Sequence, residues 1–192
     1  MLYCFVMRQL FIAEVKTRSP FGFESDKSWD ELFEVAAQHG KWISVHTNPR
    51  WGGSMDLITR AKGLTDKPVL AKGIHKTDDE IKEALDAGAD YVLTVRDRPS
   101  DTIDPAVVLY EPRWLQGVHD ISDAIGDSAL HLVWNARDLR TGGGKLVDFS
   151  AARNMTSAWM AQASMIETVA DVHPEADAII VGQHLEKFVA SL

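Results

Sequence analysis

Eight short apolar runs alternate with amphipathic segments along the 192 residues, and this rhythm predicts a (βα)8 barrel that occupies residues 1–192 as a single domain. The runs are rich in Val, Ile and Leu, and most of them do not alternate with polar residues. This pattern is typical of parallel strands covered by helices. The length leaves about 24 residues for each unit, so the barrel is compact beside the usual size of about 250 residues. An open doubly wound sheet is the structural alternative.

The expected strands are the apolar runs 10–15, 42–46, 68–71, 91–95, 106–110, 130–134, 158–163 and 178–181. Ser28 and Thr77 each begin a capping box that marks the start of a helix, and Gly40 and Gly88 mark the expected ends. Further helices are expected at 55–63, 112–124, 164–172 and 183–190. The connection 96–105 is short, polar and contains two prolines, so we expect little or no helix there.

Composition excludes several classes of function. The formal charge of −8 argues against a partner that is a nucleic acid or an anionic membrane, because either would need a basic face. Apolar residues make up 45% of the chain and charged residues 25%, which excludes a disordered protein. A small anionic substrate is still compatible with this charge, because a pocket can be locally positive. The composition does not predict an oligomeric state.

Cysteine usage and the first residues bear on the compartment. Cys4 is the single cysteine, so neither an intrachain disulfide nor a thiolate zinc cage can form, and a reducing cytoplasm is the expected location. The apolar segment 1–7 has no basic residue before it, and we expect no signal peptide. No apolar stretch approaches the roughly 18–20 residues that span a bilayer.

Polar residues recur where the expected strands end. Glu14 and Lys16 share one face of the first strand, and Lys72, Glu111 and Asn135 each stand at the C-terminal end of a later one. A charged residue in this position is commonly just the first solvated residue of a loop. Five such positions on four strands nevertheless converge on one mouth in a barrel, which is where (βα)8 enzymes build their active sites. Two lysines, two glutamates and an amide can bind an anion and move protons.

These residues lie within segments that resemble the indole-3-glycerol phosphate synthase family. The resemblance covers 12–20 (IAEVKTRSP), 43–47 (ISVHT), 51–54 (WGGS), 68–72 (PVLAK), 87–90 (AGAD), 135–139 (NARDL) and 178–182 (AIIVG). The matches run in order across nearly the whole chain. The first-strand and NARDL motifs are fairly specific, whereas AGAD is common to many sugar-phosphate barrels.

The resemblance implies a lyase of tryptophan biosynthesis. Enzymes of this family close the indole ring of 1-(2-carboxyphenylamino)-1-deoxyribulose 5-phosphate with loss of carbon dioxide and water. It implies that Lys72 is the general acid at the ketone oxygen and that Glu111 is the base of the dehydration. Lys16 would hold the substrate carboxylate and could serve as an acid. Glu14 would tune the lysines and bind sugar hydroxyls, and Asn135 would bond nearby.

The resemblance also implies a set of substrate-binding residues. Ser19 and Gly182 would help to hold the phosphate through hydroxyl and backbone N–H groups. Arg137 in the NARDL motif and Ser164 in the strand-seven motif are expected to contact substrate, and Trp51 is expected to supply part of an aromatic wall. No metal and no organic cofactor is implied.

This sequence departs from the family pattern at several positions. The family carries a helical extension before its first strand, and we expect this cover to be absent. Gly73 and Ile74 stand where Asp-Phe usually follows the strand-three lysine. The Glu-Ser-Gly of strand seven aligns with 162–164 (QAS), and Gln183 replaces a small residue. The binding residues depart further than the acid–base set, so we expect a raised KM before lost chemistry.

Two other functions fit the same residues. One is a non-catalytic barrel that binds a sugar phosphate. The other is a different barrel lyase or isomerase in which Lys72 forms a Schiff base. The segment 141–145 (TGGGK) lacks the spacing of a phosphate-binding P-loop and is expected to be a mobile loop that can act as a lid. His46 is expected to line the pocket rather than to bind a metal.

Overall fold

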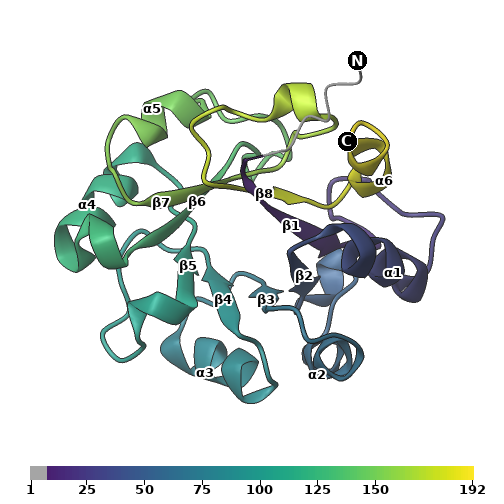
Figure 1. The fold of residues 1–192 in the computed structure, drawn as a ribbon. Helices are drawn as coiled ribbons and strands as arrows, with labels where there is room; N and C mark the ends of the chain where they lie inside the picture. The colour runs from purple at the N-terminus through teal and green to yellow at the C-terminus, as the bar shows by residue number, and fades with distance from the viewer. Residues whose placement is uncertain (1–7) are drawn as a thin grey trace.

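The computed structural model describes residues 8–192 and contains a closed barrel of eight parallel strands in the order β1 to β8 (Figure 1). The predicted (βα)8 barrel is confirmed, and the open sheet is excluded. Residues 1–7, which include Cys4, lie outside the described residues. The expected absence of a signal peptide concerns this segment and stays a prediction. Among the described residues, no helix combines the length and apolar character needed to span a bilayer.

The strands are β1 Leu10–Val15, β2 Trp42–His46, β3 Val69–Lys72, β4 Tyr91–Thr94, β5 Val108–Tyr110, β6 His131–Asn135, β7 Trp159–Ala163 and β8 Ala178–Val181. The apolar runs predicted the bounds of β1, β2 and β8 fully, and those of the other strands to within two residues. β3 and β6 each extend by one residue to include the polar side chain at the end, Lys72 and Asn135. Neighbouring strands pair in parallel around the whole barrel.

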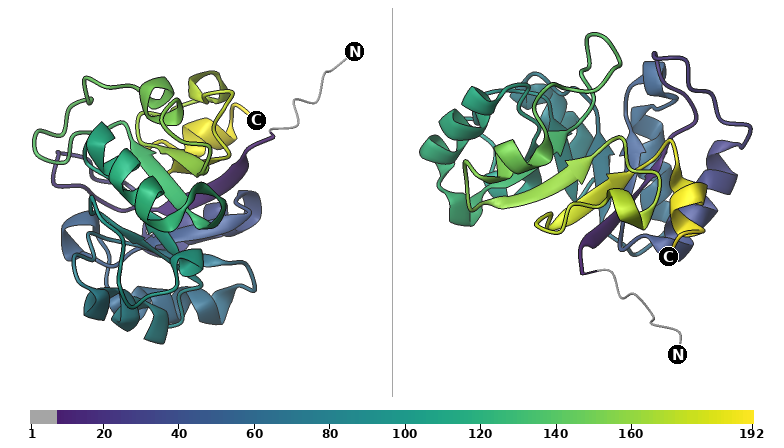
Figure 2. Two further views of the ribbon diagram at one scale, coloured as in Figure 1. Left: turned by 90° about the vertical axis from the view of Figure 1, so that its left-hand side faces the viewer. Right: turned by 90° about the horizontal axis from the view of Figure 1, so that it is seen from above.

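The α-helices are α1 Trp29–His39, α2 Met55–Leu64, α3 Asp78–Asp86, α4 Leu115–Ile125, α5 Phe149–Arg153 and α6 Leu185–Val189, and they surround the barrel (Figure 2). Both predicted capping boxes are present. The hydroxyls of Ser28 and Thr77 each accept a hydrogen bond at 3.3 Å from the backbone N–H three residues ahead. α1 ends just before Gly40, and α3 ends two residues before Gly88, whose φ of +102° favours glycine.

The helix predicted over 164–172 is wrong. Ser164 and Met165 adopt φ of +65° and +55°, a left-handed backbone that cannot begin a right-handed helix. The rest of the segment is irregular apart from the short turn η4, Val169–Asp171. Gln162 on β7 holds this loop, donating to the carbonyl of Asp171 at 2.9 Å and accepting from the N–H of His173 at 2.8 Å.

Other connections differ less from expectation. The β4–β5 connection holds only the short turn η2, Pro105–Val107, as its prolines predicted. α4 begins at Leu115, three residues later than expected, because the chain first leaves β5 through Pro112. The brief helix α5 was not predicted. The remaining short turns are η1 Pro49–Trp51 and η3 Asp127–Ala129.

The barrel interior is apolar at one end and polar at the other. Inward-facing Ile12, Leu70, Leu109 and Val133 pack together in its middle. The end where the strands begin is closed by aromatic rings, with Trp42 stacked on Tyr91 at 4.1 Å and on Trp159 at 6.4 Å between ring centroids. Because side chains alternate along a strand, the next inward positions beyond the apolar layer are the polar residues at the strand ends.

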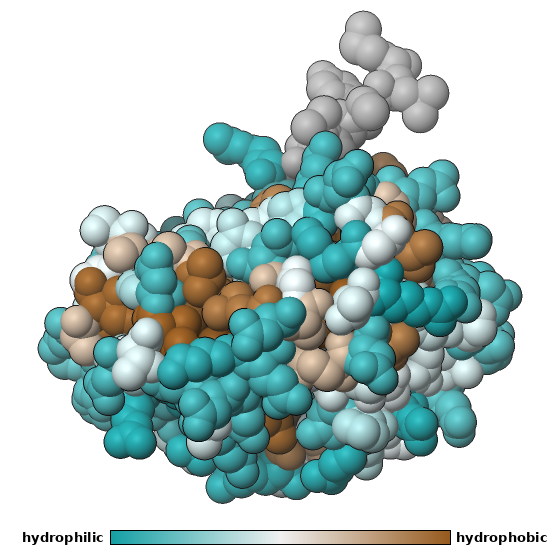
Figure 3. Space-filling model, turned by 90° about the horizontal axis from the view of Figure 1, so that it is seen from below, coloured by the Kyte–Doolittle hydropathy of each residue, from teal (hydrophilic) through white to brown (hydrophobic). Residues whose placement is uncertain are grey.

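The outer surface is largely hydrophilic on the face drawn in Figure 3, where apolar side chains gather in separate patches. Large apolar side chains that are exposed among the described residues are Leu64, Trp114, Leu146, Met155, Met165 and Leu192. Trp114 and Leu146 lie in neighbouring loops at the polar end of the barrel.

Candidate active site

The five residues predicted to carry catalysis come together at the C-terminal end of the barrel. Glu14, Lys72, Glu111 and Asn135 are all buried, with at most 8% of each residue exposed, and Lys16 is partly buried beside them. Lys72, Glu111 and Asn135 lie two residues beyond Leu70, Leu109 and Val133, so they continue the inward rows of the strands.

Glu14 is the centre of a buried charge cluster. Its Oε1 lies 2.9 Å from Nζ of Lys72, and the same oxygen contacts Nε2 of His46. Burial alone would raise the pKa of Glu14. The charge of Lys72 and the charge and hydrogen bonding of His46 outweigh this effect and hold the pKa well below its ordinary value. Glu14 is therefore a carboxylate at neutral pH.

His46 lies at the end of β2 and lines the pocket beside this carboxylate. Burial lowers its pKa, and the charge and hydrogen bonding of Glu14 oppose this shift. Its ring stacks on Trp51 with 5.9 Å between centroids and an interplanar angle of 8°. Nδ1 is buried and has no hydrogen-bond partner among the described residues. The sequence predicted a pocket-lining histidine, but not its contact with Glu14.

Glu111 and Asn135 form a second buried pair. Nδ2 of Asn135 donates to Oε1 of Glu111 at 2.9 Å, and Oδ1 of Asn135 accepts from the N–H of Arg137 at 3.0 Å. Burial raises the pKa of Glu111, while Lys72 and the hydrogen bond from Asn135 oppose the rise. A carboxyl group with a raised pKa can take up a proton closer to neutral pH than an ordinary glutamate.

Lys16 faces the same space from β1. Burial lowers its pKa, Glu14 opposes this, and the charges of Lys72 and Arg137 lower it further. The cationic side chains that meet at the mouth are therefore Lys16, Lys72 and Arg137. The overall charge of the protein is negative, but this mouth is suited to an anionic ligand.

A pocket that encloses about 460 Å³ of open space lies over these residues. Its polar lining consists of Lys16, His46, Lys72, Glu111, Asn135, Arg137 and Ser164. Its apolar lining consists of Phe21, Trp51, Ile74, Leu93, Val95 and Leu139, with Gly73 between the two. Three predicted binding residues, Trp51, Arg137 and Ser164, thus line the pocket.

The other two predicted binding residues lie elsewhere. Gly182 lines an adjoining recess together with Ser164 and Arg137. A Cβ at Gly182 would stand 2.0 Å from Oε2 of Glu14, so the backbone can approach the carboxylate only because this residue is glycine. Ser19 is not among the lining residues of either space. Its hydroxyl instead accepts a hydrogen bond from the N–H of Phe21 at 3.0 Å and shapes a turn.

The backbone after β7 turns at Ser164 and Met165, which both have positive φ, the conformation in which glycine is favoured. The alignment of residues 162–164 with the Glu-Ser-Gly motif of strand seven stays a prediction.

The residue that follows β2, Thr47, holds the backbone carbonyl of Lys72 in place. The N–H of Thr47 donates to it at 2.9 Å, and Oγ1 of Thr47 lies 2.9 Å from Nε2 of His75. Nδ1 of His75 donates to the carbonyl of Leu93 at 2.6 Å, so the neutral ring accepts from Thr47. A Cβ at Gly73 would stand 2.4 Å from Oγ1 of Thr47 and 2.7 Å from Cε1 of His75. This packing explains why an aspartate cannot occupy position 73 here.

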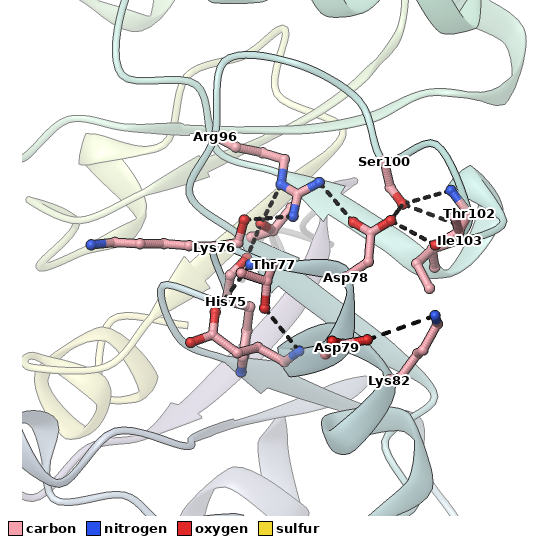
Figure 4. Close-up of polar contacts among 12 residues, drawn as sticks. His75, Lys76, Thr77, Asp78, Asp79, Lys82, Arg96, Ser100, Thr102 and Ile103 are labelled. Atoms are coloured by element: carbon pink, nitrogen blue, oxygen red, sulfur yellow. Dashed lines mark hydrogen bonds and ion pairs between the residues drawn. The ribbon is translucent and has the colours of Figure 1, made fainter.

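The loop after β3 is braced by a polar network centred on Asp78 (Figure 4). Asp78 accepts hydrogen bonds from Arg96 at 3.0 Å, from Ser100 at 2.8 Å and from Thr102 at 2.6 Å. The hydroxyl of Thr102 contributes most to lowering the pKa of Asp78, to about 2. Arg96 also donates to the carbonyl of Lys76 at 2.8 Å. The network ties the start of α3 to the β4–β5 connection, and no local sequence pattern predicted it.

The glycine-rich loop after β6 lies against the β1–α1 loop at the mouth. In the right-hand view of Figure 2 it projects at the top of the picture, on the side of the barrel opposite the start of β1. Nη1 of Arg137 donates to the carbonyl of Gly142 at 2.7 Å, and a Cβ at Gly142 would stand 2.5 Å from Cδ1 of Phe21. The loop is thus at the position that a lid requires, and its closure remains a prediction.

The fold is a (βα)8 barrel. The mouth of this barrel holds buried acidic and basic side chains that suit an anionic ligand. No protein-family model matches the chain. It is 33% identical over 103 residues to the indole-3-glycerol phosphate synthase of Thermoplasma acidophilum, a match that covers 52% of this chain and 43% of that protein. It is 26% identical over 156 residues to the synthase of Sulfurisphaera tokodaii, covering 78% and 58%.

A third relative, the indole-3-glycerol phosphate synthase of Campylobacter curvus, is 35% identical over 91 residues, covering 44% of this chain and 34% of that protein. The chain thus spans about half the length, or less, of the curated relatives it matches. These distant homologues confirm the resemblance read from the motifs and indicate an enzyme of the same general barrel type. Among residues 8–192, no three His, Cys, Asp or Glu side chains are grouped to hold a metal ion.

Proposed function

We propose that the protein converts 1-(2-carboxyphenylamino)-1-deoxyribulose 5-phosphate into indole-3-glycerol phosphate with release of carbon dioxide and water. The observation that carries this proposal is that a proton donor, Lys72, and a proton acceptor, Glu111, lie in the same buried mouth of the barrel. Lys72 is an ammonium paired with Glu14, and Glu111 is a carboxyl group with a raised pKa held by Asn135. Ring closure followed by dehydration needs an acid and a base of this kind side by side.

In the first step, the aromatic carbon that bears the carboxylate attacks the ketone carbon of the sugar chain. Lys72 donates a proton to the ketone oxygen, which becomes a hydroxyl group. The bond from the ring to the carboxylate then breaks, carbon dioxide leaves, and its electron pair restores the aromatic ring. Lys16 holds the carboxylate until this bond breaks, and its partly buried position strengthens the attraction.

In the second step, the new hydroxyl group takes a proton from Lys16 and leaves as water. Glu111 removes a proton from the adjacent carbon of the sugar chain, and the electron pair forms the double bond of the indole. Glu111 suits this role because burial raises its pKa, while Asn135 fixes the orientation of its carboxyl group.

Binding is assigned to the surroundings of these groups. We assign the substrate phosphate to the recess lined by Ser164, Gly182 and Arg137, and the aryl ring to the apolar wall that includes Trp51 and Leu93. The role of Ser19 in phosphate binding, a place in tryptophan biosynthesis and a cytoplasmic location remain predictions.

The test is direct assay of indole-3-glycerol phosphate by absorbance after addition of the carboxyphenylamino-deoxyribulose phosphate. Lys72→Ala should abolish product formation. Lys82→Ala is the matched control, because Lys82 is an exposed lysine on the neighbouring helix α3 and should leave the rate unchanged. Absence of turnover at saturating substrate in the unaltered protein would overturn the proposal. A binding isotherm without turnover would then favour the non-catalytic barrel.

A further inference from the structure

A second compartment opens beside the main pocket, between the start of α4 and the loop that follows β6. It encloses about 900 Å³ of open space, against about 460 Å³ in the main pocket. Its walls include the apolar side chains of Trp114, Trp134 and Leu146. Glu111 and Leu139 line both spaces, so the two compartments share one wall. None of the roles assigned above uses this second space.

Part of the apolar wall is open to solvent, whereas Trp134 is buried, with 1% exposed. Trp114 is 49% exposed, and Leu146 is as exposed as in an extended chain. Exposed apolar surface that lines a hollow is typical of a binding site, because a ligand that covers it removes the surface from water. The exposed indole of Trp114, with the Arg140 guanidinium 4.9 Å from its ring centroid, favours a flat ring over an alkyl chain, since aromatic rings gain from stacked or edge-to-face contact.

Three cationic side chains also line the compartment, and they are not equivalent. Arg113 pairs with Asp97 at 2.6 Å, and Arg140 pairs with Asp138 at 3.0 Å. Lys145 forms no ion pair with any residue in the range 8–192. The compartment therefore offers a single unneutralised positive charge.

Lys145 is held within the apolar wall rather than in solvent. Its Nζ lies 4.1 Å from the centroid of the Trp134 ring and 3.4 Å from the carbonyl oxygen of Pro112. Burial lowers its pKa, and nearby carboxylates, Glu111 foremost, oppose the change. An ammonium group has three N–H donors; one bonds to the carbonyl of Pro112 and the Trp134 ring covers one side, which leaves the rest of the group available to an anion.

We propose that this compartment is a second ligand-binding site, which takes a flat aromatic ring bearing one carboxylate. The ring would lie against Trp114 and Leu146, and the carboxylate would accept hydrogen bonds from Lys145. A doubly charged phosphate is disfavoured, because Glu111 and Asp138 also line the space and would repel it. This inference does not depend on the proposed ring-closure activity.

The test is calorimetric titration at pH 7 with 2-naphthoate, which has a flat ring and one carboxylate. We expect a saturable site that is retained when Lys16→Met removes a cation from the main pocket. Lys145→Met should weaken binding about tenfold or more, because it removes a charge-assisted hydrogen bond while keeping the side-chain length, and Lys145→Arg should largely restore it. The neutral analogue 2-naphthalenemethanol should bind as weakly to the unaltered protein as 2-naphthoate does to Lys145→Met.

A second variant locates the ligand. Lys16→Met removes a cation from the main pocket and should leave 2-naphthoate affinity unchanged, while the NMR indole N–H signals of Trp114 and Trp134 should shift on binding. Equal affinity of Lys145→Met and the unaltered protein would overturn the proposal, as would loss of binding in Lys16→Met alone or no binding at millimolar probe. Because the readout is binding, a protein that fails the ring-closure assay can still pass this test.

Discussion

Glu14 and Lys72 form a buried ion pair, with 2.9 Å between Oε1 and Nζ, at the polar end of a barrel whose interior is otherwise apolar. A pair of this kind does not by itself stabilise a fold, because both charges have lost their hydration. The ion pair instead fixes the position of Lys72 Nζ, which is held against one oxygen of Glu14 at the mouth of the barrel. His46 touches the same oxygen from β2, so three neighbouring strands meet at one carboxylate.

Replacement of Glu14 tests this relationship. Glu14→Gln leaves the Lys72 ammonium buried without its counter-charge, so we expect a loss of about 3 kcal/mol of stability at pH 7 and at least a tenfold lower kcat. Urea unfolding and the ring-closure assay measure the two effects. Glu83→Gln, an exposed glutamate on α3, is the control and should change neither quantity.

The pH dependence of this loss has a defined sign. The folded-state pKa of Glu14 lies below its ordinary value of 4.5, so the stability it contributes is fully present above about pH 4.5. It disappears as the pH falls through the lower, folded-state pKa. The stability difference between the unaltered protein and Glu14→Gln should therefore shrink in acid, and a constant difference from pH 7 to pH 3 would contradict the assignment.

Glu111 should show the opposite relation between stability and function. Its folded-state pKa is raised by burial, so its contribution is fully present below about pH 4.5 and is lost as the pH rises through the folded-state value. Glu111→Gln keeps an oxygen to accept from Asn135 and removes the buried charge. We expect this variant to gain on the order of 1 kcal/mol at pH 7 and to lose the ring-closure activity.

Two measurements separate this prediction from simple damage to the fold. Thermal unfolding at pH 7 should give a higher Tm for Glu111→Gln than for the unaltered protein, and the gap should close near pH 4. A lower Tm at pH 7 would show that the carboxylate is well compensated in the folded protein, and the assignment of a raised pKa would then be wrong.

The fold and the grouping of the candidate site residues could be predicted from sequence because both depend on strand periodicity. Eight apolar runs gave eight strands, and alternation along each strand put Lys72, Glu111 and Asn135 on the inward rows. These are local properties of the chain. The positions of the two capping boxes are equally local, and both were predicted correctly.

The errors arose where contacts distant in sequence decide the structure. The loop after β7 is not helical because Ser164 turns into a left-handed conformation and Gln162 bonds to the far end of the loop. The contact of His46 with Glu14 joins different strands. None of these features has a periodic signal.

Gly73 provides a prediction about backbone packing. Gly73→Ala would push a Cβ to 2.4 Å from Oγ1 of Thr47, so we expect a loss of about 1–3 kcal/mol and a lower kcat as the Lys72 carbonyl loses its fixed position. Gly63→Ala is the matched control. Gly63 lies in α2 with nothing within 4 Å of an added Cβ, and alanine should stabilise this helix by about 0.5–1 kcal/mol. Equal effects of the two substitutions on unfolding would refute the proposed packing constraint.

Met165 offers a test of the phosphate recess. It has a φ of +55° and is 46% exposed, so its side chain contributes little packing while its backbone is strained. Met165→Gly should relieve about 1 kcal/mol of strain and let the backbone approach the substrate phosphate, which lowers KM severalfold with little change in kcat. Met165→Ala removes the same side chain but keeps a Cβ, so it separates backbone freedom from side-chain loss. Steady-state kinetics of both variants should show the lower KM in the glycine variant alone. A similar fall in KM for Met165→Ala would mean that the side chain obstructs the recess and that the left-handed backbone is not the cause.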